Sequence, residues 1–346
     1  MNQTSTQQTD MPKTADARDW VNILARYRTP NQLRSAFELG ITIVAFFGLW
    51  AAAWYALSIS YWLAAAIAVV NGGFLLRLFI IQHDCGHSAF FNNRHVGDWI
   101  GRALGVLTLT PYDVWKRTHS IHHSASGNLD KRGMGDVHTL TVEEYRQKSF
   151  WGRFGYRLYR HPVVLFGLGP TYLFMLQNRL PIGLMKSGVK YWISAMGTNA
   201  GIALGLALVI WFGGLMPFLL VFLPTSLIAA SVGVWLFYVQ HQFEDTHWDH
   251  NSDWQLHDAA LHGSSHYVLP GVLRWLTGNI GVHHVHHLYA RIPFYRLTEV
   301  LRDYPVLAEA QRLGLIESFA CVKLQLWDER QRRLLSYAEA RRLYGR

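Results

Sequence analysis

The sequence predicts an all-α integral membrane protein with four transmembrane helices in two hairpins, interfacial helices and a cytosolic helical cap. Apolar residues make up 50% of the 346 residues and charged residues only 16%, against roughly a quarter in soluble proteins. The apolar residues are also concentrated in four long runs, as membrane-spanning helices require. This composition excludes a disordered or collagen-like chain, and two distant cysteines, Cys85 and Cys321, indicate no disulfide framework.

Each predicted span is long enough to cross a hydrocarbon core of ~30 Å. The four runs are residues 39–57, 61–81, 191–212 and 215–239. Only three residues separate the first two runs and only two glycines separate the last two, which predicts two tight helical hairpins. Buried hairpins of a soluble bundle are the alternative, but such helices normally keep a polar face, and these runs have none.

The segments outside the hairpins are predicted to be cytosolic. Of the 32 Lys and Arg residues, five precede the first run, 14 lie in residues 82–190 and 12 follow Val239, whereas neither short turn carries any. Because positive loops stay in the cytosol, both termini and the middle segment are placed there. Contact of this basic side with anionic lipid headgroups explains the net charge of +9, so binding to nucleic acid is not needed as an explanation.

This topology divides the chain into three parts. Residues 1–35 form a cytosolic tail and interfacial segment, whose Gln- and Thr-rich start is expected to be disordered. Residues 36–299 form the main domain, and residues 300–346 form a cytosolic helical segment. Two apolar stretches, 103–110 and 163–178, are too short to span a bilayer and are predicted to be interfacial helices.

The spacing of the 18 histidines is the strongest signal in the sequence. His83 and His87 are four residues apart, which on a helix places both rings on one face. Two H-x-x-H-H clusters repeat this geometry with three rings each, namely His119, His122 and His123, and His283, His286 and His287. His241 follows the last span at the same distance as His83 follows the second span, so the two are expected at similar depth.

These histidines predict a site for two metal ions in the cytosolic cap. Eight or nine imidazoles exceed what one zinc ion needs, because a tetrahedral site takes four ligands and a catalytic one three. Imidazole binds Zn, Cu, Fe or Ni, so the ligand chemistry leaves the metal open. A histidine-rich metal transporter is an alternative, but it would place ionisable residues inside the spans, where Arg77 is the sole charge.

At these residues the sequence resembles the membrane fatty acid desaturases, the histidine-box family of di-iron enzymes. Residues 83–87 are similar to the HxxxH box, residues 119–123 to the HxxHH box and residues 283–287 to the final [H/Q]xxHH box. The likeness extends over residues 37–296. The stretch 239–244 is similar to bacterial acyl-lipid enzymes of the delta-12 (omega-6) and delta-5 type.

The resemblance implies an O2-dependent enzyme of the bacterial cytoplasmic membrane that inserts a cis double bond into an acyl chain. It also implies an external, ferredoxin-like electron donor, and the sequence contains no HPGG haem-binding motif and no dinucleotide fingerprint. It implies two irons bound by His83, His87, His119, His122, His123, His283, His286 and His287, with His241 as a ninth ligand. A histidine-box hydroxylase or monooxygenase of alkyl chains or carotenoids is the alternative.

Further residues are expected around this site. Asp84 and Glu244 are candidates for accepting ring protons of ligand histidines, with an ordinary surface position as the alternative for each. His284 falls on an unspecified position of the last box and is expected behind the ligands. Arg77 is expected to snorkel or to pair with a carboxylate, and Glu38 to lie at the interfacial end of the first span. The aromatic candidates for the wall of an acyl channel are Tyr112, Trp115, Phe237 and Tyr238.

Overall fold

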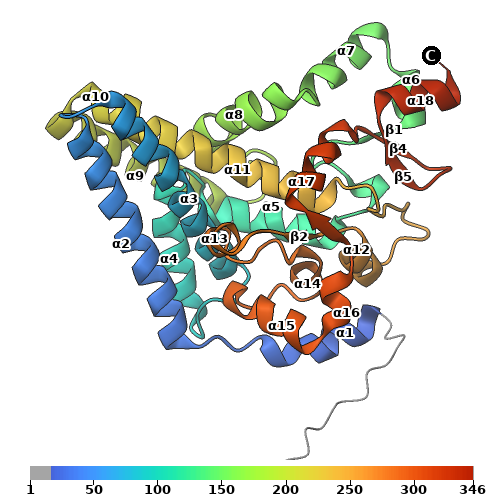
Figure 1. The fold of residues 1–346 in the computed structure, drawn as a ribbon, viewed down its shortest axis with the longest axis horizontal. Coiled ribbons are helices and arrows are strands. Elements are labelled where there is room, and N and C mark those ends of the chain that lie inside the picture. The colour runs from blue at the N-terminus through green and yellow to red at the C-terminus, as the bar shows by residue number, and fades with distance from the viewer. Residues whose placement is uncertain (1–16, 346) are drawn as a thin grey trace, which may run out of the picture.

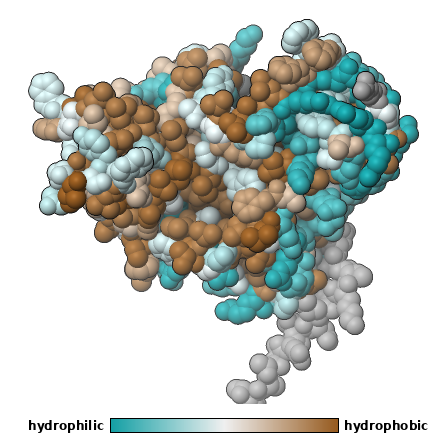
Figure 2. All heavy atoms as spheres, turned by 45° about the horizontal axis from the view of Figure 1, so that its top comes forward, coloured by the Kyte–Doolittle hydropathy of each residue, from teal (hydrophilic) through white to brown (hydrophobic). Residues whose placement is uncertain are grey.

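The computed structural model describes residues 17–345, in which long apolar helices form one end of the molecule and a polar cap forms the other (Figures 1 and 2). The start of the chain that was expected to be disordered lies outside the described residues. Hydrophobic residues cover the end that contains the long helices, and hydrophilic residues cover the cap in Figure 2. This separation agrees with a protein that is partly immersed in a membrane.

Within residues 17–345, four helical stretches are long and apolar enough to cross a membrane, which confirms the predicted fold class. They are α2 (Gln32–Ala56), α3 (Tyr61–Gly86), α9 (Val189–Gly213) and Leu215–His241, which comprises α10 (Leu215–Pro217), the π-helical turn η5 (Phe218–Phe222) and α11 (Leu223–His241). The π-helical turn ends two residues before Pro224, whose missing N–H group interrupts regular α-helical bonding.

The second and fourth spans continue beyond the apolar runs that predicted them. α3 extends past residue 81 and carries His83 in its last turn, and α11 extends past residue 239 to His241. Both histidines are buried by protein. In the most apolar 18-residue stretch of each span, 56% is buried inside the protein in α3 but only 11% in α9. α3 therefore runs through the interior, whereas α9 presents most of its surface outward.

A buried ion pair joins the first two spans. The Arg77 guanidinium on α3 contacts the Glu38 carboxylate on α2, and each side chain is only 1% exposed. Arg77 also donates to the backbone carbonyl of Trp275, and Glu38 accepts from Arg34 at 2.6 Å. The expectation that Arg77 pairs with a carboxylate is met by a neighbour on the adjacent span.

The cap is built from short elements. Its helices before the second hairpin are α1 (Ala17–Leu24), α4 (Arg94–Leu107), α5 (Tyr112–Ala125), α6 (Val142–Gln147), α7 (Phe150–Tyr159), the π-helical turn η3 (Val164–Leu168) and α8 (Gly169–Met175). Those after it are α12 (Leu256–His262), α13 (Gly271–Leu276), α14 (His283–Leu288), α15 (Leu297–Asp303), α16 (Pro305–Glu309), α17 (Leu315–Ser318) and α18 (Tyr337–Tyr344). The predicted interfacial stretches fall on the end of α4 and on η3 and α8.

Short strands add two small sheets that the sequence analysis did not predict. The strands are β1 (Leu140–Thr141), β2 (His266–Val268), β3 (Arg312–Gly314), β4 (Leu326–Asp328) and β5 (Arg333–Leu335). β1 pairs in parallel with β4, β4 pairs antiparallel with β5, and β2 pairs in parallel with β3. The C-terminal segment is therefore not entirely helical. Strands of two or three residues are too short to show a period-two pattern.

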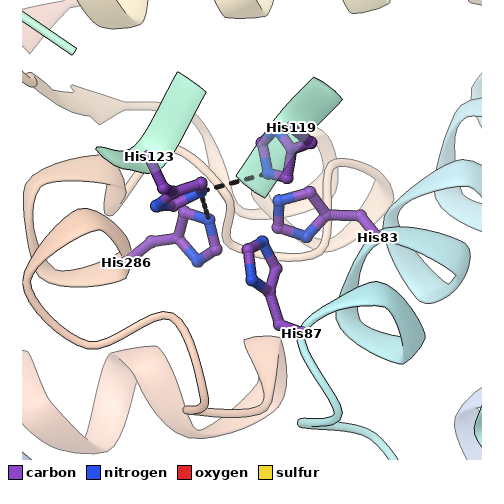
Figure 3. Close-up of side chains that lie close together, drawn as sticks. All are labelled: His83, His87, His119, His123 and His286. Atoms are coloured by element: carbon purple, nitrogen blue, oxygen red, sulfur yellow. Dashed lines mark hydrogen bonds between the residues drawn. The ribbon is translucent and has the colours of Figure 1, made fainter. Parts of the chain in front are cut away.

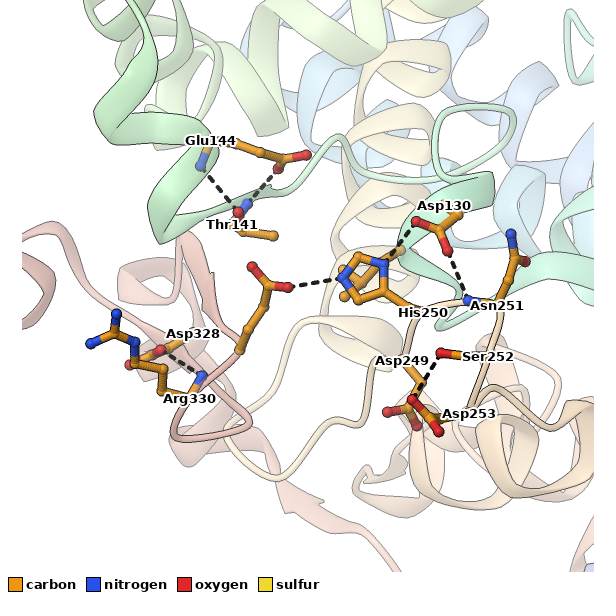
Figure 4. Close-up of polar contacts among 12 residues, drawn as sticks. Asp130, Thr141, Glu144, Asp249, His250, Asn251, Ser252, Asp253, Asp328 and Arg330 are labelled. Carbon is orange, nitrogen blue, oxygen red and sulfur yellow. Dashed lines mark hydrogen bonds and ion pairs between the residues drawn. The ribbon is translucent and has the colours of Figure 1, made fainter.

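Polar contacts connect the C-terminal hairpin to the rest of the cap (Figure 4). The His250 ring lies between two carboxylates, with Nδ1 2.8 Å from Asp130 and Nε2 2.8 Å from Glu329. Asp130 follows α5, whereas Glu329 lies in the turn between β4 and β5. These contacts raise the pKa of His250, chiefly through its hydrogen bond to Glu329, and hold the hairpin against the loop that follows α5.

Candidate metal centre

The structure brings nine histidines from four helices into two adjacent groups. Within each group, one ring nitrogen from every member lies within 4.8 Å of those from all the others. The first group, shown in Figure 3, contains His83, His87, His119, His123 and His286. The second contains His122, His241, His283 and His287. These are the nine residues that the sequence analysis singled out, and their ligation of a metal stays a prediction.

Each H-x-x-H-H cluster is divided between the two groups. On α5, His119 and His123 join the first group and His122 joins the second. On α14, His283 and His287 join the second group and His286 joins the first. Around a helix, positions i and i+4 are separated by about 40°, whereas i+3 lies about 60° to the other side of i. The sequence analysis treated each cluster as one face, but the i+3 ring points to a separate group.

The distances between ring nitrogens fit ligands arranged around a common ion. In the first group, His123 Nε2 lies 3.1 Å from the Nε2 atoms of both His119 and His286 (Figure 3). In the second, His241 Nε2 lies 3.1 Å from that of His122 and 3.0 Å from that of His283. Two nitrogens about 2.1 Å from one ion at a right angle are about 3.0 Å apart, whereas tetrahedral ligands are about 3.4 Å apart.

Burial favours the neutral form of five of these rings, which is the form that binds metals. The pKa values of His119 and His123 on α5 lie well below the usual range, mainly because the rings are removed from water. Neighbouring imidazoles lower these pKa values further. The same causes lower the pKa of the three α14 histidines of the two groups. His87 Nε2 is buried without a hydrogen-bond partner among the described residues. A cation would satisfy the lone pairs of these rings.

Several rings are oriented by contacts at the nitrogen that faces away from the group. His122 Nδ1 lies 2.6 Å from Asp136 Oδ1, and His83 Nδ1 lies 3.2 Å from Asp84 Oδ1. His241 Nδ1 lies 3.1 Å from the backbone oxygen of Gly263. A proton on Nδ1 would donate to each acceptor and leave Nε2 free to bind a metal. Asp84 thus lies where it was expected, whereas Asp136 was not anticipated.

Two other predicted residues lie away from the groups. Glu244 is exposed and makes no side-chain hydrogen bond or ion pair within residues 17–345. The geometry therefore favours an ordinary surface position for Glu244 over a role in orienting a ligand ring. His284 is buried, but its Nε2 lies 2.8 Å from the backbone oxygen of Leu307 in α16, and burial lowers its pKa to about 3. It connects α14 to α16 rather than supporting a ligand ring.

A cavity of about 410 Å³ opens onto the first group. Its lining combines histidines of both groups with other residues, namely His87, His119, His123, His287, Gly86, Trp115, Lys116, Ser120, Ser124, Leu256 and Ala290. The Trp115 ring stacks on the His119 ring with centroids 4.6 Å apart. The first group is therefore accessible through this cavity.

The four aromatic channel candidates separate into two pairs. Trp115 lines the large cavity, and the Phe237 ring lies 5.0 Å from the His122 ring and beside a much smaller cavity. Tyr112 and Tyr238 line neither of these cavities. The Tyr112 hydroxyl donates to Asp98, and the Tyr238 hydroxyl donates to the backbone oxygen of Cys321. These two tyrosines therefore contribute to packing of the cap.

The sequence was compared with known proteins. A family model described as fatty acid desaturase matches residues 60–318, a range that contains all nine histidines. A fatty acid desaturase from Bacillus subtilis (strain 168) is 44% identical over 317 residues, which cover 91% of this chain and 89% of that protein.

More distant similarity connects the chain to cyanobacterial proteins. An sn-1 acyl-lipid omega-3 desaturase (ferredoxin) from Synechocystis sp. is 28% identical, covering 82% of this chain and 78% of that protein. An sn-1 oleoyl-lipid 12-desaturase from Anabaena variabilis is 25% identical, covering 81% and 79%.

Proposed function

This chain belongs to the fatty acid desaturase family and is an oxidoreductase, and from that premise we propose that its two histidine groups bind two iron ions. The proposed reaction is the O2-dependent insertion of a cis double bond into a lipid-bound acyl chain. The observation that carries the proposal is the convergence of nine ring nitrogens in two adjacent groups beside an accessible cavity. The membrane-spanning helices support an acyl lipid as substrate.

The donor set fits iron. Nine imidazoles are more than a pair of tetrahedral zinc ions would use, because each tetrahedral ion takes four ligands. The chemistry that iron supplies when bound is reductive activation of O2, an oxidation that no amino-acid side chain can perform. In the balanced reaction, the two C–H bonds of the substrate together supply two electrons and two protons, and an external donor supplies two more electrons. With two further protons, these reduce O2 to two molecules of water.

The chain's own residues would position the substrate. Trp115, Gly86 and Leu256 supply apolar surface to the cavity beside the first histidine group. An extended acyl chain held there would present one pair of carbons to the ring nitrogens, and this alignment would determine where the double bond forms. We propose the delta-12 (omega-6) or delta-5 position, with support from the stretch 239–244 and from the oleoyl-lipid 12-desaturase relative, whereas the Synechocystis relative is named an omega-3 desaturase.

The electrons are proposed to come from a ferredoxin-like protein on the cytosolic side of the bacterial cytoplasmic membrane. The name of the Synechocystis relative includes the word ferredoxin. The two turns between paired spans carry no Lys or Arg, so the basic middle and C-terminal segments, both termini and the histidine groups are assigned to the cytosol. A basic surface on that side would steer an acidic donor toward the cap.

The test is expression of the full chain with a ferredoxin and its reductase in a host that lacks unsaturated fatty acids. Fatty acid analysis with location of the double bond should reveal a new cis alkene, and purified protein should contain two irons per chain. His122→Ala should abolish the product and lower the iron content but leave membrane insertion intact. Glu244→Gln, at an exposed position, is the matched control and should retain activity. A hydroxy fatty acid without an alkene would favour the hydroxylase alternative and refute desaturation.

A further inference from the structure

An uninterrupted row of large apolar side chains lies exposed along α7 and the helical segment after it. On α7, the exposed residues are Phe150, Trp151, Phe154 and Leu158, and Trp151 is 74% exposed. Their spacing places them on one face of the helix, opposite the buried Tyr156. An exposed aromatic face of this size in a folded protein indicates that another phase or molecule covers it.

The row continues from α7 to the membrane-spanning surface. The exposed apolar residues that follow are Val163, Leu168, Tyr172, Leu176, Leu180, Ile182, Met185 and Val189, the last at the start of α9. η3 and α8 pack on α11, and the ribbon extends from there past the spans as α7 (Figure 1). The apolar face of α7 is therefore continuous with the surface that the spans present to lipid.

The charge of this segment is of one sign. The sequence contains no acidic residue between Glu144 and Glu244, whereas residues 146–190 carry eight Lys and Arg. On α7, Arg153 lies beside the apolar row, and the exposed Lys148 lies two residues before the helix. Arg157 instead donates to the Tyr145 hydroxyl of the cap at 2.6 Å. Aromatic residues beside cations are typical of helices that lie in the headgroup region of anionic membranes. A second copy of the same face would meet it with like charges and is disfavoured.

The buried side of α7 is bonded to the cap near the metal centre. The Tyr156 hydroxyl donates to the backbone oxygen of Gln325, which precedes β4. Arg160, directly after α7, is fully buried without a carboxylate partner among the described residues. It donates to Gln242 Oε1 at 3.0 Å and to the backbone oxygen of Leu324 at 2.8 Å. Gln242 directly follows the predicted ligand His241.

We propose that α7 lies in the cytosolic leaflet as an in-plane anchor, with its aromatic row among the acyl chains and its cations on anionic phospholipid headgroups. The anchor holds the C-terminal strands and the His241 end of α11 at a fixed height above the bilayer through Tyr156 and Arg160. The inference relies on the membrane location of the spans and is independent of the metal and of the reaction. Its failure is therefore distinguishable from failure of the proposed activity.

The test places a fluorescent label at the centre of the row. Cys85 and Cys321 are buried, so an NBD probe reacts selectively with an introduced cysteine, and unsubstituted protein measures the background. Trp151→Cys places the probe on the row, and Val306→Cys places it on α16, an exposed apolar position beside the charged end of α15. Each full-length protein is reconstituted in nanodiscs of phosphatidylcholine, with or without phosphatidylglycerol and with or without lipid that carries a nitroxide near its headgroup.

The probe at residue 151 should show blue-shifted emission and lose intensity to the nitroxide lipid, whereas the probe at residue 306 should do neither. Quenching at 151 should increase when phosphatidylglycerol is present, and Lys148→Gln with Arg153→Gln should remove that increase. Equal, water-like emission at both positions would overturn the inference. A probe at 151 that is shielded from water but unquenched by the lipid would assign the face to a protein partner and would also overturn it. The absence of any increase with phosphatidylglycerol would refute the role of anionic lipid, and an increase that survives the charge substitutions would refute the role of Lys148 and Arg153.

Discussion

Removing the carboxylate of Asp136 tests whether contacts behind the ligands control metal binding. The Asp136 Oδ1 atom lies 2.6 Å from His122 Nδ1, closer than the 3.2 Å between Asp84 and His83. His122 is 1% exposed, so the pair is shielded from water on the ligand side. Asp136→Ala removes the acceptor that fixes the His122 tautomer, whereas Asp136→Asn keeps an acceptor oxygen but removes its charge.

The size of the effect follows from the contact. Loss of such an outer partner typically lowers metal affinity about 10- to 100-fold, which corresponds to about 1.4 to 2.7 kcal/mol. Asp136→Ala should approach the upper value, because the contact is short and His122 has no other hydrogen-bond acceptor at Nδ1 among the described residues. Asp136→Asn should fall between Ala and the parent chain, since a charged acceptor forms a bond roughly twice as strong as a neutral one.

The assay is iron retention at graded concentrations of a chelator, measured on purified protein in detergent. The loss should begin in the four-histidine group, to which His122 belongs, and should extend to the other group through the helices α5 and α14 that both groups share. Glu244→Gln removes a carboxylate that contacts no ligand ring within residues 17–345 and should retain iron as the parent chain does. If Asp136→Ala eluted as folded protein and retained iron equally well, the argument that Asp136 orients a ligand would be refuted.

Three further predictions concern stability. Glu38→Gln leaves the buried Arg77 without its anion and should lower the free energy of unfolding by about 3 to 5 kcal/mol, whereas adding Arg77→Met should recover part of that loss in a double-mutant cycle. Gly101→Ala would place a Cβ atom 2.3 Å from the Tyr112 ring and should cost about 1 to 3 kcal/mol in thermal unfolding, whereas Gly155→Ala meets no atom within 4 Å and should cost nothing. The lowered pKa values of His119 on α5 and His283 on α14 mean that the unfolded chain binds more protons than the folded chain below about pH 6.5. The stability of the metal-free protein should therefore be constant above that pH and decrease below it, and a flat profile down to pH 5 would contradict this.

The sequence was sufficient to predict the membrane fold and the histidines that the structure brings together, because both depend on local periodicity, whereas metal binding by these histidines stays a prediction. Uninterrupted apolar runs predict spans, and a spacing of three or four residues brings rings together on a helix. The ends of α3 and α11 were underestimated because hydropathy decreases where protein replaces lipid. His83 and His241 lie in that region, where burial in the cap keeps the polar turn helical.

The parts that could not be predicted depend on contacts between distant segments. Asp136 reaches His122 through a loop, and no local pattern distinguishes it from other carboxylates such as Glu244. The strands β1 and β4 are far apart in the sequence and too short for a period-two pattern to emerge. His284 lies within a histidine box, but only the position of α16 reveals that its ring faces Leu307.

The division of both H-x-x-H-H clusters has a consequence for how the protein acquires its ions. α5 and α14 each contribute to both groups, so occupying one group fixes the rotation of two helices that the other also needs. The entropy cost of ordering those helices arises once, when the first ion binds, and the second ion then binds to histidines that are already in position. Iron uptake should therefore be cooperative, with few half-filled molecules. A foreign ion that imposes tetrahedral geometry on one group would rotate the shared helices and disturb its neighbour as well.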